Sequence, residues 1–135
     1  MRLLAVFVAC VLVSSCKEDG PVGPTVPVNE RFVLPAGATA SIERTSLRVR
    51  FERVSGDSRC PADAICIQGG DAIVHVMVVD GKVETPHELH TADPARGQAT
   101  QGRYRIALVE LQPYPFSSRT IAPGDYRATF TVSEF

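Results

Sequence analysis

Short stretches of alternating apolar and polar residues recur from residue 30 to the C-terminus, and turn-forming residues separate them. The last stretch is the clearest, because apolar residues at every second position are separated by Arg127, Thr129 and Thr131. Such an alternation places the apolar side chains on one face of a β-strand, whereas an amphipathic helix needs a spacing of about 3.6 residues. No convincing helical stretch is present, so the sequence predicts an all-β protein.

The expected strands follow from this pattern. They are 32–34, 38–42, 47–51, 72–79, 82–85, 104–111 and 126–132, with one further weak strand between 86 and 101. Val54 is out of phase with the alternation before it, which predicts a β-bulge. Asp80-Gly81 predicts a hairpin turn. About seven strands at intervals of roughly 8 to 12 residues predict an immunoglobulin-like β-sandwich, with a small β-barrel as the alternative.

The length and composition fit one packed domain. The chain has 135 residues, of which 44% are hydrophobic, and this is enough to bury a core. Its 14 basic residues are balanced by 15 acidic ones, which argues against a nucleic-acid partner.

The N-terminus has the pattern of a secretory signal. Arg2 precedes an apolar run from Leu3 to Val13, and two serines follow that run. Eleven apolar residues are too few for a helix that crosses a hydrocarbon layer of about 30 Å. We therefore expect residues 1–15 to be removed as a signal peptide.

Val13-Ser14-Ser15-Cys16 resembles a bacterial lipobox, in which the cysteine becomes the lipidated first residue of the mature chain. Cys10 is a competing cleavage point, but it would leave an apolar run of only seven residues, so Cys16 is preferred. Residues 16–29 are then the lipidated cysteine and a Pro/Gly-rich tether, and residues 30–135 are the sandwich domain. The resemblance implies a lipid-anchored protein of the bacterial cell envelope, and Lys17 points to the outer membrane if the host is diderm.

Cys60 and Cys66 are the two cysteines that remain after lipidation and cleavage. An exported protein enters an oxidising compartment, so we expect them to form a disulfide. Their spacing differs from the Cys-x-x-Cys of redox sites, and local sequence supplies no set of four metal ligands. The predicted disulfide is therefore structural.

Asp57-Ser58-Arg59-Cys60-Pro61, then Cys66, then Gly70-Asp71-Ala72 forms the most specific motif of the domain. It resembles a set of small secreted bacterial proteins, many of them lipoproteins, whose function is uncharacterised. That pattern has a tryptophan where this chain has Gln68. The resemblance implies a location and a fold, and it implies no activity.

Evidence for catalysis or for a metal is weak. His87 and His90 are three residues apart, which on a strand directs them to opposite faces, and His75 lies inside an apolar strand. Ser55 and Ser58 lie near Asp57, but no nucleophile elbow, metalloprotease motif or phosphate loop is present. We expect no metal, no cofactor and no enzymatic activity, with a small hydrolase as the alternative.

The loop from Asp57 to Asp71 is the expected binding site, because the disulfide would pre-organise it. Arg59, Asp63 and Gln68 are its candidate contact residues, and the partner would be an envelope protein or a glycan. If neighbouring strands align them, the strand arginines could form a stripe that meets an anionic glycan or lipid headgroups; they are Arg48, Arg50, Arg103, Arg105 and Arg127. The favoured interpretation is a solvated sheet face balanced by Glu52, Glu84 and Glu110. Two alternatives stay open: a protease-inhibitor-like use of the loop, and a structural cap with Ile65 and Ile67 packed inward.

Overall fold

The computed structural model describes residues 23–135, so the predicted signal peptide, Cys10 and Cys16 lie outside the described residues. One short 3-10 helix, η1 (Pro123–Asp125), precedes the last strand. The strands in chain order are β1 (Thr25–Val26), β2 (Arg31–Pro35), β3 (Thr39–Ile42), β4 (Leu47–Asp57), β5 (Ala72–Asp80), β6 (Val83–His90), β7 (Gln98–Gln101), β8 (Tyr104–Gln112) and β9 (Arg127–Glu134). No helix within residues 23–135 is long and apolar enough to cross a membrane.

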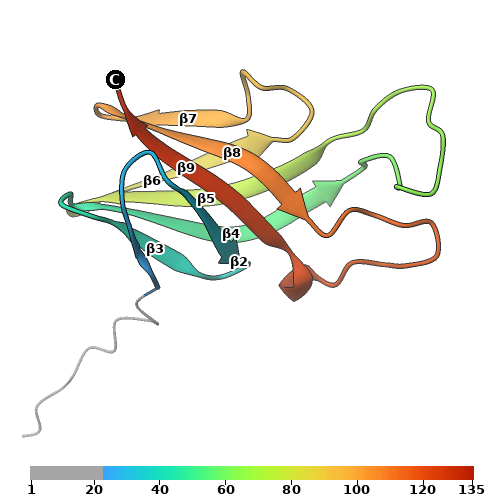
Figure 1. The fold of residues 1–135 in the computed structure, drawn as a ribbon, viewed down its shortest axis with the longest axis horizontal. Coiled ribbons are helices and arrows are strands. Elements are labelled where there is room, and N and C mark those ends of the chain that lie inside the picture. The colour runs from blue at the N-terminus through green and yellow to red at the C-terminus, as the bar shows by residue number, and fades with distance from the viewer. Residues whose placement is uncertain (1–22) are drawn as a thin grey trace, which may run out of the picture.

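The strands form two layers (Figure 1). One sheet has the order β1-β3-β4-β5-β6, and the other has the order β2-β9-β8-β7. Neighbouring strands are antiparallel except for β1 and β3. The predicted β-sandwich is therefore confirmed, and the described residues form no closed barrel.

The core lies between the two sheets and is built by the predicted alternation. Phe51 on β4 meets Phe130 on β9 edge to face, with ring centroids 6.1 Å apart, and Phe32 packs against the same ring. Every second residue is buried in residues 47–51 of β4 and in β9. Successive side chains of a strand point to opposite faces, so the residues between the buried ones point away from the core.

The strand order differs from that of an immunoglobulin domain, in which the first, second, fifth and fourth strands share a sheet. Here β3 to β6 follow one another in one sheet, and the described chain changes sheet between β1 and β2, between β2 and β3, and between β6 and β7. Alternation identifies a strand and its buried face, but both sheets bury a face, so it does not identify the sheet.

Several local predictions are confirmed. The register of β4 against β5 shifts twice, between Phe51 and Arg53 and between Val54 and Gly56, which is the expected bulge and a second one. Gly81 has a φ of +61° in the hairpin turn between β5 and β6. β6 continues past the predicted end at Thr85 to His90, since Pro86 is tolerated in a strand at the edge of a sheet.

The sheet also begins earlier than the predicted domain start at residue 30. Thr25 and Val26 pair with β3, and Glu43 donates a hydrogen bond of 2.8 Å to the Val26 carbonyl. Val26 and Val28 pack against the core. A strand of two residues is too short to show an alternation. The Pro/Gly-rich composition of residues 16–29 therefore predicts a tether there and no strand.

Candidate functional site

Two loops extend from the same end of the sandwich (Figure 1). The first, residues 58–71, joins β4 to β5 and is drawn in green; the second, residues 113–122, joins β8 to η1 and is drawn in orange. We call this the two-loop end. The turns between β3 and β4 and between β5 and β6 lie at the opposite end of the same strands.

The disulfide between Cys60 and Cys66 is present, with Cα atoms 6.0 Å apart, as predicted. Hydrogen bonds also hold this loop against its neighbour: Ala62 N donates to the Pro115 carbonyl at 2.9 Å, and Ser117 N donates to Asp63 Oδ1 at 2.9 Å. The bond from the Ser117 backbone lowers the pKa of Asp63 below its ordinary value. The two loops therefore support each other.

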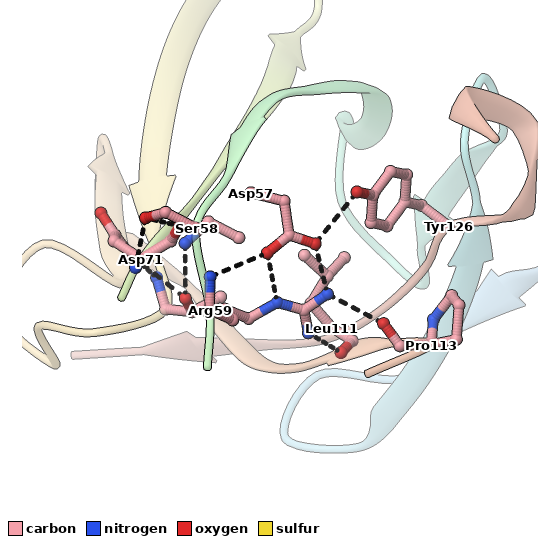
Figure 2. A network of polar contacts seen from close by, with 9 residues as sticks. Asp57, Ser58, Arg59, Asp71, Leu111, Pro113 and Tyr126 are labelled. Carbon is pink, nitrogen blue, oxygen red and sulfur yellow. Dashed lines mark hydrogen bonds and ion pairs between the residues drawn. The ribbon is translucent and has the colours of Figure 1, made fainter. Parts of the chain in front are cut away.

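A buried ion pair lies at the base of the two loops (Figure 2). Arg59 donates from Nε and Nη2 to the two carboxylate oxygens of Asp57, at 2.8 and 2.7 Å. The same guanidinium donates to the carbonyls of Leu111 and Pro113, at 2.6 and 2.8 Å, and Tyr126 donates its hydroxyl to Asp57 at 3.0 Å. This network joins the end of β4 to the end of β8 and the start of β9.

The charges in this network shift two pKa values. Burial raises the pKa of Asp57, but hydrogen bonds from Arg59 and Tyr126 more than offset this and hold it below its ordinary value. Burial and the neighbouring Asp57 carboxylate raise the pKa of Tyr126 to about 12. The Asp57 carboxyl group is therefore ionised at neutral pH while Tyr126 keeps its proton.

The other end of the motif closes the loop. Ser58 N donates to the Asp71 carbonyl at 2.7 Å, and a Cβ atom added at Gly70 would lie 1.4 Å from the Ser58 carbonyl oxygen. Asp71 accepts hydrogen bonds from Thr91 N and Ala92 N. Burial raises the pKa of Asp71, but the hydrogen bond from His90 and those from Thr91 and Ala92 lower it overall. Asp57, Arg59, Gly70 and Asp71 are thus residues that build the two-loop end.

Tyr114 and Phe116 give this end an exposed aromatic surface. The Arg59 guanidinium lies 5.2 Å from the centre of the Tyr114 ring, while 49% of Tyr114 is exposed. Arg119 covers Phe116 in the same way, at 5.2 Å. A hollow of about 500 Å³ beside them is lined by Ala62, Gln112, Pro113, Tyr114, Phe116, Arg119, Thr120, Ile121 and Asp125.

The structure changes the interpretation of the predicted contact residues. Arg59 was expected to be exposed but is buried, because its guanidinium bonds to the Leu111 and Pro113 carbonyls. Asp63 and Gln68 are exposed, although Asp63 is also bound by Ser117. The inward packing of Ile65 and Ile67 is wrong: both side chains have 104% of their reference exposure.

The strand arginines do not form one stripe. Arg48 and Arg50 lie on β4 in the five-stranded sheet, whereas Arg105 and Arg127 lie on β8 and β9 in the other sheet. Arg103, before β8, pairs with Glu134 at 3.0 Å. The arginine stripe, the less favoured of the two interpretations of these residues, is therefore wrong because they divide between two sheets.

The histidines have separate environments. Within residues 23–135 no three potential metal ligands of the His, Cys, Asp and Glu types come together. His90 is buried and donates from Nδ1 to Asp71. Its Nε2 accepts a hydrogen bond from Arg96 Nη2 at 2.6 Å. His75 lies on the outer face of its sheet, and its Nε2 is 2.7 Å from Ser55 Oγ.

Sequence reasoning did not identify Tyr114 and Phe116 as site residues. They alternate with Pro113 and Pro115 in the segment between the predicted strands 104–111 and 126–132. Two aromatic residues in a proline-rich loop segment were the available signal.

No protein-family model matches the chain, and no curated protein or solved structure shows significant similarity to it.

Proposed function

We propose that the chain is a lipid-anchored protein of the bacterial cell envelope whose sandwich binds a partner protein through the two-loop end. The signal-like N-terminus and the resemblance of residues 13–16 to a lipobox support the anchor. The single observation that supports binding is the set of large apolar side chains exposed on two loops that are hydrogen-bonded to each other: Ile65, Ile67, Tyr114 and Phe116. In this account the domain binds and does not catalyse a reaction.

Burial of these side chains would drive association. Moving one large apolar side chain out of water contributes about 1.5–3 kcal/mol. The disulfide and the bond from Ser117 to Asp63 already order the loops, so binding has less conformational entropy to overcome. Aliphatic side chains gain most from an apolar partner surface, which favours a protein over a glycan.

Site-specific photo-crosslinking tests this proposal. A photoreactive amino acid is placed at Ile65 or at Tyr114 in cells that produce the protein, with Val83 as the control position. Val83 is also exposed and apolar, but it lies at the other end of β6 from His90. We expect a discrete crosslinked protein from positions 65 and 114 and none from 83. Equal products at all three positions, or none at 65 and 114, would contradict the proposal.

A hydrolase is a second candidate, and one contact favours it. Ser55, at a bulge of β4, is hydrogen-bonded to His75 at 2.7 Å, and Glu88 Oε1 is 3.8 Å from His75 Nδ1. Serine, histidine and a carboxylate in this order are the groups of a nucleophilic hydrolase. However, these three residues lie on the outer face of a sheet. Glu88 is largely exposed, so its interaction with the His75 imidazole is weak.

Labelling with a fluorophosphonate probe distinguishes the two candidates. A nucleophilic Ser55 would be labelled in the wild-type chain but not in Ser55→Ala, whereas Ser58→Ala would keep the label. Ser58 is a suitable control because its hydroxyl bonds to the Asp71 backbone. We expect no labelling, since the binding account assigns Ser55 no reaction.

A further inference from the structure

The loop of residues 58–71 exposes Ile65 and Ile67 on either side of Cys66, which the disulfide joins to Cys60. We infer that this loop is a substrate-like inhibitor that enters the active-site cleft of a serine protease with an aliphatic specificity pocket, and that Ile67 occupies that pocket. The inference rests on the proposed function, because it names the partner of the two-loop end.

The shape of the segment fits a cleft. Ile65 and Ile67 flank Cys66, and both side chains project fully into solvent beyond the ends of β4 and β5. Figure 1 shows the loop extending past the strands. Two aliphatic side chains separated by one residue match the alternate pockets of a cleft that binds an extended polypeptide.

The segment is fixed on both sides of Ile67. On one side, Cys66 is joined to Cys60 by the disulfide. On the other side, Gly70 contacts the Ser58 backbone so closely that a Cβ atom has no room, and Ser58 N bonds to the Asp71 carbonyl. Only Ile67, Gln68 and Gly69 lie between these fixed points.

A second layer of contacts supports the loop from behind. Ala62 and Asp63 are held by Pro115 and Ser117, and Arg59 is held by Asp57 and by two carbonyls of the β8 region. Protease inhibitors bind tightly because their interface backbone is already in its bound shape. The contacts at the base of this loop supply that property.

The fixed points also change the outcome of cleavage. A protease that cuts between Ile67 and Gln68 adds one water across the peptide bond, which leaves a carboxyl group on Ile67 and an amino group on Gln68. Each new end lies within three residues of a fixed point, so the two ends stay close together. The Ile67 carboxyl group and the Gln68 amino group can then re-form the peptide bond and release one water. The loop then stays in the cleft, where an ordinary substrate would leave as two products.

Inhibition of elastase tests the inference, with trypsin for comparison. Elastase has a small specificity pocket, whereas the trypsin pocket carries an aspartate and selects basic residues. We expect the full chain, purified in detergent, to inhibit elastase half-maximally at or below about 1 µM. Ile67→Asp should raise the inhibition constant at least ~100-fold, which is the size of a hot-spot effect. Val83→Asp, an equally polar change at the opposite end, should leave it unchanged.

A change of specificity provides the decisive variant. Ile67→Arg should lose elastase inhibition and gain trypsin inhibition, because the same rigid loop would present a basic side chain. The inference is overturned if the wild-type chain leaves elastase fully active, or if trypsin rapidly and permanently cuts Ile67→Arg after residue 67. If either result occurs while positions 65 and 114 still crosslink to an envelope protein, the inference fails and the proposed function stands.

Discussion

The Asp57–Arg59 pair fixes two segments that are more than 50 residues apart in the chain. The Arg59 guanidinium reaches the carbonyls of Leu111 and Pro113, at sequence separations of 52 and 54. It also lies over the Tyr114 ring, 5.2 Å from the ring centre. A charged pair of this kind builds the binding surface without being exposed on it.

Replacing Asp57 by Asn should destabilise the domain by about 3–5 kcal/mol, because it leaves the buried Arg59 charge without its partner. The pKa of Asp57 is lowered in the folded state, so its contribution is present above its ordinary pKa of 3.8 and is lost as the pH falls through the folded value. Urea unfolding of the wild type should therefore show a loss of stability below about pH 4.

The variant provides the control for that pH dependence. Asp57→Asn should show a shallower loss of stability in acid, with the remainder due to Asp63 and Asp71, whose pKa values are also lowered. An unchanged slope would show that the Asp57 carboxylate contributes nothing to acid sensitivity.

Gly70 and Gly69 provide a matched pair for a second prediction. Gly70→Ala places a methyl group against the Ser58 carbonyl and should cost about 1–3 kcal/mol, because backbone must move to admit it. Gly69→Ala has open space and should stay within about 0.5 kcal/mol of the wild type. Equal unfolding free energies for the two variants would contradict the close approach.

These residues show why the sequence identified the motif but not its role. Asp57, Arg59 and Cys60 are adjacent in one short sequence motif, so the sequence alone identifies them as a group. Whether Arg59 is exposed depends on carbonyl groups at the end of β8 and in the loop after it, and no local pattern encodes their position.

At the scale of elements, the strands with clear alternation were predictable and the exceptions have physical causes. β4, β8 and β9 each bury one face, so hydropathy marks them. β1 gains its place through backbone pairing with β3, and β6 continues through Pro86 as an edge strand. Backbone pairing leaves no hydropathy signal, so these features needed the three-dimensional structure.

The disulfide shapes a loop and not the core, because Cys60 and Cys66 both lie between β4 and β5. Replacing Cys60 and Cys66 by Ser should lower the free energy of unfolding by about 2 kcal/mol and leave the far-ultraviolet spectrum of the strands unchanged. Alkylation of the unreduced, exported chain followed by intact-mass measurement should detect no free thiol. Two alkylated cysteines would contradict the pairing.

In the whole molecule, the proposed lipid anchor and the proposed binding surface are parts of one short chain. If Cys16 carries the lipid, only six residues separate it from the first described residue, Gly23. Such a segment spans at most about 20 Å, so the sandwich would stay near the membrane surface.

Cys16→Ser should abolish incorporation of labelled palmitate and release the domain from the membrane fraction, whereas Cys10→Ser should leave both unchanged. The reason is that the lipobox resemblance places the acylated residue at 16. Unchanged labelling of Cys16→Ser would remove the anchor from the account.

Measuring partner binding and unfolding free energy on the same variants tests whether the two-loop end is the binding surface. The variants are the double substitution Ile65→Ser with Ile67→Ser, and the control Val83→Ser, all exposed aliphatic positions. The account predicts that the double variant loses the partner identified by crosslinking while its unfolding free energy stays within about 0.5 kcal/mol of the wild type. Val83→Ser should keep both. Full binding by the double variant, at unchanged stability, would contradict the claim that the two-loop end is the binding surface.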